Sequence, residues 1–145
     1  MGRGIHYECE KCNEKYDFYY GIGMLYFFSQ KELETKVKSG EYGEKLKQKF
    51  QENPFSHISA ERDLYFCPNC HVPMNDFNLS VVKGNGLFSD GNIIFRYVHE
   101  CPKCKIEMIS YTESDIENET EKCPEDLRCP KCDGKLKEND WYFWD

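Results

Sequence analysis

Aromatic residues dominate the first stretch of the chain and alternate with polar ones. From His6 to Tyr26 they surround glycines at positions 21 and 23. Alternation with a period of two, together with aromatic enrichment and nearby glycines, is typical of strands joined by a tight turn. We therefore predict a short β-hairpin over this stretch.

The pattern then becomes helical. Ser29-Gln30-Lys31-Glu32 fits a capping box, with its serine as N-cap and its glutamate at the third helical position. Leu33 and Val37 lie four residues apart and would share one helix face. A second helix is predicted to begin near Tyr42 and to end before Asn53-Pro54, because a residue before proline avoids the helical conformation. The two helices would form an insertion over about residues 29–52.

The remainder of the chain has strand character. Short apolar or alternating runs predict strands at residues 64–66, 77–83, 92–99, 106–111 and 134–144. Asn85-Gly86 and Asp90-Gly91 carry the chemistry of tight turns, and residues 113–126 form an acidic stretch that predicts an exposed loop. We predict two lobes, residues 1–83 with the helical insertion and residues 84–145 with the acidic loop and an aromatic C-terminal strand.

Nine cysteines are present, and eight of them form C-x-x-C pairs. The pairs are Cys9/Cys12, Cys67/Cys70, Cys101/Cys104 and Cys129/Cys132. Two intervening residues let a tight turn (a knuckle) aim both sulfurs at one point, and two knuckles supply the four thiolates that Zn²⁺ prefers. We therefore predict two structural four-cysteine sites and two Zn²⁺ ions per chain.

Two other uses of paired cysteines fit the sequence less well. Disulfides need an oxidising compartment, whereas Met1-Gly2-Arg3-Gly4 leads into polar sequence without an apolar signal segment, so we expect a cytoplasmic protein. A thioredoxin-like redox site needs a single C-x-x-C pair at a helix N-terminus. Closed four-thiolate sites leave no open coordination position for a substrate, so we do not expect an enzyme.

Two pairings of the four knuckles are possible. Neighbours in sequence are usually neighbours in space. On this ground we predict a first site from Cys9, Cys12, Cys67 and Cys70 and a second site from Cys101, Cys104, Cys129 and Cys132. The alternative joins Cys67/Cys70 to Cys101/Cys104 and closes the chain ends on each other.

The remaining possible ligands are one cysteine and four histidines. Cys123 is not at C-x-x-C spacing from another cysteine, and we predict a free thiol there. Four thiolates already complete each site, so the histidines are expected around the ligands or on the surface. They are His6, His57, His71 and His99.

The cysteine pairs lie in motifs that resemble zinc ribbons. Tyr7-Glu8-Cys9-Glu10-Lys11-Cys12-Asn13-Glu14-Lys15-Tyr16 resembles a first knuckle running into its hairpin, and Leu127-Arg128-Cys129-Pro130-Lys131-Cys132-Asp133-Gly134-Lys135-Leu136 resembles a second knuckle with Gly134 at its turn. The opening through Gly21-Ile22-Gly23-Met24-Leu25-Tyr26 is similar to small, uncharacterised bacterial zinc-ribbon proteins. Rubredoxins also have paired knuckles and bind iron, but within one short domain. The ribbon resemblance brings no established activity.

Composition and charge narrow the range of partners. The chain has 145 residues, 39% hydrophobic and 31% charged, which suits one compact domain or two very small ones. No apolar run approaches the ~18 residues of a membrane span, so no membrane partner is expected. The formal net charge is −7. Zinc in two tetrathiolate sites would lower it to about −11, which disfavours contact with nucleic-acid phosphates.

The last strand would have aromatic residues on both faces. Trp141 and Phe143 would point one way, and Tyr142 and Trp144 the other. Either both faces are packed within the fold, or one face contacts a partner protein or a second copy of the chain.

These observations lead to one expected fold and one expected function. The fold is a small, metal-bound, β-rich α+β structure of two zinc ribbons, with a helical insertion in the first. The function is that of a non-enzymatic interaction, adaptor or regulatory module. A nucleic-acid-associated ribbon protein is the alternative, and a metal- or redox-responsive protein is a third, weaker hypothesis.

Overall fold

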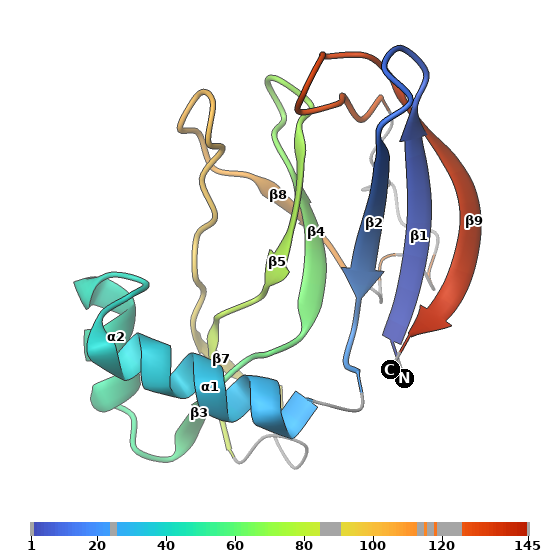
Figure 1. The fold of residues 1–145 in the computed structure, drawn as a ribbon. Coiled ribbons are helices and arrows are strands. Elements are labelled where there is room, and N and C mark those ends of the chain that lie inside the picture. Colours follow the sequence, from blue (N-terminus) through green and yellow to red (C-terminus); the bar gives the residue numbers. More distant parts are fainter. Residues whose placement is uncertain are drawn as a thin grey trace. The chain divides into compact units, whose positions relative to one another are not determined.

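The computed structural model describes residues 2–23, 26–84, 91–112, 115, 118 and 126–144. Its helices are α1 (Tyr26–Ser39) and α2 (Glu44–Gln51). Its strands are β1 (Gly2–Cys9), β2 (Lys15–Tyr20), β3 (Ser56–Ile58), β4 (Arg62–Phe66), β5 (Pro73–Phe77), β6 (Val81–Lys83), β7 (Ile93–Phe95), β8 (Ile109–Tyr111) and β9 (Leu136–Trp144). They form three small sheets, β2-β1-β9, β5-β4-β8 and β3-β6-β7 (Figure 1). The fold is therefore small, β-rich and of the α+β class.

Contacts divide the chain into two units. The knuckle unit consists of residues 1–23, 62–76 and 98–145, and it contains all four C-x-x-C pairs. The insertion unit consists of residues 24–61 and 77–97, and it contains both helices and the sheet β3-β6-β7. These units do not coincide with the predicted division after residue 83, because the chain leaves the knuckle unit twice and returns to it twice.

Each departure from the knuckle unit begins and ends at residues that lie close together. On either side of the first, Gly21 and Arg62 exchange two backbone hydrogen bonds of 2.9 and 3.0 Å. On either side of the second, Nε2 of His99 lies 3.7 Å from Oδ2 of Asp76. A long insertion adds little to the cost of loop closure when its two ends already meet.

The sheet β2-β1-β9 covers the main hydrophobic core of the knuckle unit. β1 is the central strand and pairs antiparallel with both neighbours, with Gly2 opposite Trp144 (Figure 1). One face of the sheet packs against Leu64 of β4 and Tyr111 of β8. The buried residues of this core are Ile5, Tyr7, Cys9, Phe18, Tyr20, Leu64, Tyr111, Leu127, Cys129 and Leu136. The cysteines that begin the first and fourth knuckles therefore belong to the core itself.

On the other face of the same sheet, aromatic rings of β9 lie over glycines of β1. A Cβ atom on Gly4 would lie 2.4 Å from the ring of Tyr142, and one on Gly2 would lie 2.5 Å from the ring of Trp144. Any side chain at these positions would displace the rings. The glycines therefore allow β9 to pack its aromatic side chains across β1.

Several sequence predictions can be compared with these elements. The N-terminal hairpin, both helices and the final strand are confirmed. The capping box is wrong, because α1 begins at Tyr26 and Ser29 lies inside the helix. The single strand over residues 77–83 is also wrong. The chain breaks between β5 and β6, where Leu79 adopts a left-handed backbone with a φ of 60°.

Other predictions fall outside the described residues. The turn at Asn85-Gly86 lies there, as do Asp90 of the second turn, most of the acidic stretch 113–126 and Cys123. Neither α1 nor α2 combines the length and the apolar character that a membrane-spanning helix requires.

Candidate metal centres

The four C-x-x-C pairs adopt one backbone conformation. In each, the N–H of the first cysteine donates to the carbonyl of the residue five positions later, with N···O distances of 2.7–3.1 Å. The carbonyl of that cysteine accepts from the N–H of the residue four positions later, at 2.9–3.0 Å. These latter residues all have left-handed backbones, with φ between 57° and 64°: Asn13, His71, Lys105 and Asp133. The sequence therefore encodes the same knuckle four times.

Two groups of four sulfurs result. Cys9, Cys12, Cys129 and Cys132 form the terminal cluster, and Cys67, Cys70, Cys101 and Cys104 form the central cluster. Within each group, all four Sγ atoms lie within 4.8 Å of one another. Both clusters belong to the knuckle unit.

The predicted sequential pairing of knuckles is wrong, and the alternative pairing is the one observed. Cys9 and Cys12 do not join Cys67 and Cys70, because β1 pairs with β9 and places Cys9 opposite Leu136. The second site predicted from Cys101, Cys104, Cys129 and Cys132 fails for the same reason. β4 pairs with β8, with Phe66 opposite Ile109, and this brings the second and third knuckles together instead. Along the chain, the helical insertion therefore lies between the first knuckle, which belongs to the terminal cluster, and the second knuckle, which belongs to the central cluster.

The spacing of the sulfurs fits a metal ion better than disulfides. The closest Sγ–Sγ distances across the terminal cluster are 3.4 Å (Cys9 to Cys132) and 3.8 Å (Cys12 to Cys129). Those in the central cluster are 3.4 to 3.7 Å. A disulfide bond is only about 2.05 Å long. In a tetrahedron of thiolates with metal–sulfur bonds of about 2.3 Å, the sulfurs lie roughly 3.8 Å apart. Each cluster can therefore hold one tetrahedrally coordinated ion.

Each knuckle buries one sulfur and leaves the other nearer to solvent. The first cysteine of every pair is fully buried, while Cys12 is exposed and Cys70, Cys104 and Cys132 are partly buried. Backbone N–H groups point at the buried sulfurs, as in the 3.4 Å contact from Lys11 to Cys9. This arrangement stabilises thiolates while limiting the access of water to the centre.

Burial and hydrogen bonding act in opposite directions on the thiols. Burial raises the pKa of Cys101 and of Cys129, but hydrogen bonds to their sulfurs outweigh it and bring each pKa to about 6. By contrast, contacts with the sulfurs of Cys67 and Cys101 raise the pKa of Cys70 to about 12. Four thiolates in one small volume repel one another, and a bound cation relieves this repulsion.

The hydroxyl of Tyr16 reaches the terminal cluster. The Oη atom of Tyr16, on β2, lies 3.1 Å from Sγ of Cys129. Burial and the neighbouring Cys129 raise the pKa of Tyr16 above its usual value, so the hydroxyl stays protonated and donates a hydrogen bond to the sulfur when Cys129 is a thiolate. The contact crosses from the hairpin of the first knuckle to a ligand of the fourth.

The knuckle tips supply positive charge and close packing. Lysines precede the second cysteine in three of the four knuckles, at positions 11, 103 and 131, and Nζ of Lys131 lies 3.1 Å from a carboxylate oxygen of Glu14. A Cβ atom on Gly134 would lie 2.8 Å from Sγ of Cys9 and 3.2 Å from Sγ of Cys132. Gly134 is therefore required by close approach to the sulfurs.

The histidines all lie outside the four-sulfur groups. Nδ1 of His57 contacts the carbonyl of Gly84 at 2.9 Å, and the ring of His99 stacks on Tyr65 with a centroid distance of 3.8 Å. His6 contacts Asp17. The carbonyl of His71 accepts the N–H of Arg128 at 2.8 Å, and this bond links a knuckle of the central cluster to one of the terminal cluster.

Sequence reasoning missed a set of large side chains that recurs around the four knuckles. Two positions before and seven positions after the first cysteine of each pair, the chain carries a large side chain that is buried or partly buried. They are Tyr7 and Tyr16, Tyr65 and Met74, His99 and Met108, and Leu127 and Leu136. Aligning the four C-x-x-C pairs on one another would have revealed these recurring large side chains.

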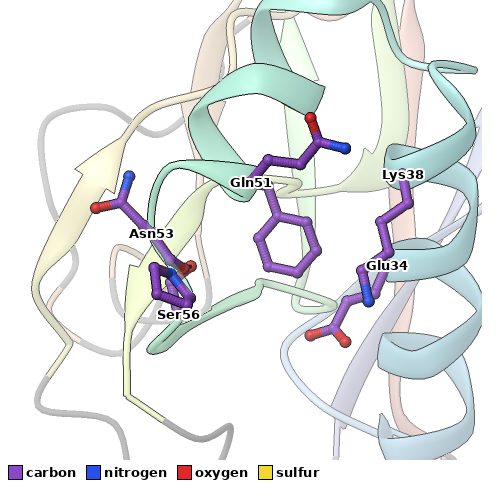
Figure 2. Close-up of a pocket in the computed structure, with 7 residues that line it drawn as sticks. Glu34, Lys38, Gln51, Asn53 and Ser56 are labelled. Atoms are coloured by element: carbon purple, nitrogen blue, oxygen red, sulfur yellow. Dashed lines mark hydrogen bonds between the residues drawn. The ribbon is translucent and has the colours of Figure 1, made fainter.

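A shallow pocket of about 320 Å³ lies in the insertion unit (Figure 2). The ring of Phe50 from α2 lines it, and Nζ of Lys38 from α1 lies 5.6 Å from the centroid of that ring. Glu34 also lines it, and this carboxylate accepts the backbone N–H of Ile58 at 3.4 Å. These groups hold α1 against α2 and β3, so their contacts are explained by packing.

Comparisons with models of protein families, with curated proteins and with solved structures find no match.

We predict that replacing one cysteine abolishes metal binding at its own cluster and leaves the other cluster loaded. Cys9→Ser should reduce the metal count from two to one and expose Cys129 and Cys132 to alkylation, because they would lose their shared ion. Cys101 and Cys104 should stay protected. Native mass spectrometry and peptide mapping after N-ethylmaleimide treatment would measure both effects. Cys67→Ser is the matched variant, and exposure of Cys9 or Cys12 in it would contradict the observed pairing.

The left-handed residue of each knuckle gives a second prediction. Lys105→Gly should raise the free energy of unfolding by about 0.5–1 kcal/mol, because a side chain in this conformation costs about 1–2 kcal/mol and the added freedom of glycine offsets part of the gain. Lys103→Gly, in the same exposed loop but without positive φ, should lower stability slightly. Urea unfolding of the metal-loaded protein would compare them, and equal losses in both variants would contradict the strain argument.

Proposed function

We propose that this chain is a structural zinc protein with one Zn²⁺ in each cluster and that it works as a non-enzymatic protein-interaction module. The observation that carries the proposal is the grouping of eight sulfurs into two four-thiol sets on four equivalent knuckles. Zn²⁺ prefers tetrahedral thiolate sets, and it has no redox chemistry of its own. When bound, it would neutralise part of the thiolate charge and hold the knuckles together.

The completeness of the ligand sets supports a structural role. Catalytic zinc sites keep one position open for water or substrate, whereas structural sites are closed by four protein ligands. Both clusters supply four sulfurs within the same small volume. In our proposal, zinc contributes to folding, and recognition is left to the protein surface.

An exposed aromatic pair on β9 supports a protein partner. Trp141 and Phe143 are 46% and 69% exposed, while Tyr142 and Trp144 on the same strand pack over glycines. β9 is an outer strand of its sheet. Exposed aromatic residues are enriched at protein interfaces because they bury much apolar area with few rotatable bonds. This surface suits a partner protein or a second copy of the chain.

Net charge makes a nucleic-acid partner the weaker candidate. The chain is already at −7, and each tetrathiolate zinc centre adds about −2. Binding to phosphates depends on cationic side chains that release counterions. The proposal therefore places recognition on β9 and not on the lysines of the knuckle tips.

We predict that chelation of the metal unfolds the knuckle unit. Structural zinc contributes about 10–16 kcal/mol to the folding of zinc-finger peptides, which exceeds the total stability of most small domains. The purified protein should contain two Zn²⁺ per chain by native mass spectrometry, and a strong chelator should abolish its near-ultraviolet circular dichroism. Zinc should restore the signal. A metal-free protein that stays folded would contradict a structural role.

We also predict that the zinc-loaded protein does not bind nucleic acid. Fluorescence anisotropy with labelled single-stranded and double-stranded oligonucleotides should show no binding even at low salt, because the net charge repels phosphates. Binding that weakens steeply as salt is raised would instead favour the nucleic-acid alternative. A variant with Lys11, Lys103 and Lys131 changed to Gln would then identify the surface responsible.

A further inference from the structure

The two clusters have the same knuckles but different surroundings. The residue seven positions after the first cysteine packs in the same hydrophobic cluster as the buried cysteines in all four knuckles. It is Leu136 in the fourth knuckle, and Met74 and Met108 in the two knuckles of the central cluster. Only the first knuckle has a hydrogen-bond donor in the side chain at this position, Tyr16.

The position of Tyr16 is fixed by its strand. It lies on β2 directly opposite Tyr7 of β1, and its ring is nearly parallel to that of Phe18, with an interplanar angle of 18° and a centroid distance of 6.2 Å. The ring is partly buried against the core of the knuckle unit. This packing places the hydroxyl at 3.1 Å from Sγ of Cys129.

Such a contact changes how a sulfur binds metal. A hydroxyl that donates to a thiolate spreads its negative charge and lowers the repulsion among four thiolates. It also orients the ligand before the metal arrives, which reduces the ordering that binding requires. Hydrogen-bond partners of metal ligands typically change affinity by about 10–100-fold.

We propose that Tyr16 is a positioning residue of the terminal cluster, which acts through Cys129 to raise metal affinity there and makes the two centres inequivalent. The inference rests on the proposed function, since it requires that both clusters bind metal. It adds a specific role for one side chain in one centre. In the central cluster, the matching methionines pack in the hydrophobic cluster of Cys67 and Cys101, and a methionine side chain has no hydrogen-bond donor.

Tyr16→Phe tests this proposal because it removes the hydroxyl and keeps the ring. The protein would be loaded with ¹¹³Cd²⁺, which replaces zinc in thiolate sites and reports the electronic state of its sulfurs by its NMR chemical shift. The unmodified protein should give two resonances, and Cys9→Ser would assign the one from the terminal cluster. In Tyr16→Phe, that resonance should move while the central one stays in place. Competition with a chelator should show an affinity loss of about 10–100-fold at the terminal cluster alone.

Tyr7→Phe is the matched control. Tyr7 lies in the same core and opposite Tyr16, and its hydroxyl donates to a carboxylate oxygen of Glu138 at 3.5 Å. It should leave both resonances and both affinities unchanged. If Tyr16→Phe behaves like Tyr7→Phe, or if both resonances move together, the role of Tyr16 is wrong even though metal binds. If the unmodified protein binds neither Cd²⁺ nor Zn²⁺, the proposed function itself is wrong, and the role of Tyr16 is wrong with it.

Discussion

Antiparallel pairing of β1 with β9 joins the two ends of the chain, and both the terminal cluster and the main core depend on it. The strands place Cys9 opposite Leu136, and the N–H of Glu10 donates to the carbonyl of Lys135 at 3.0 Å. The first and fourth knuckles thereby meet although residues 13–128 separate them. Loop-closure entropy rises only with the logarithm of loop length. Strand hydrogen bonds and buried aromatic side chains can therefore offset the cost of a very long loop.

The same closure explains how the chain tolerates two insertions. The central cluster is nested within the loop that the terminal cluster closes, and each departure from the knuckle unit starts and ends at neighbouring residues. Gly21 and Arg62 keep the backbone paired at the first departure. The helices between them need no contact with the sulfurs to be compatible with the fold. Their sequence is therefore constrained by their own packing, as in the burial of Leu46 and Phe50 on one face of α2.

Local features of this protein could be predicted from its sequence, and long-range ones could not. C-x-x-C spacing identified all eight sulfurs because a knuckle is decided within six residues of chain. Sequence proximity gave the wrong pairing of knuckles because the pairing is set by strands that lie far apart in the chain. β1 pairs with β9, and β4 pairs with β8. One signal for the pairing of β1 with β9 was present in the sequence. Gly2 and Gly4 have the same spacing as Tyr142 and Trp144, and the rings of these two residues lie over the glycines. Nothing comparable marks Leu79, whose left-handed backbone breaks the predicted strand over residues 77–83.

β9 connects the proposed metal site of the terminal cluster with the exposed aromatic surface. β9 begins directly after the fourth knuckle and pairs along β1 up to Trp144. Tyr142 and Trp144 are used to hold this strand, which leaves Trp141 and Phe143 available to a partner. Loss of metal from the terminal cluster would release the fourth knuckle, and with it the anchored start of β9. In the proposed function, an ion in the terminal cluster therefore supports the strand that carries the aromatic surface without touching a partner itself.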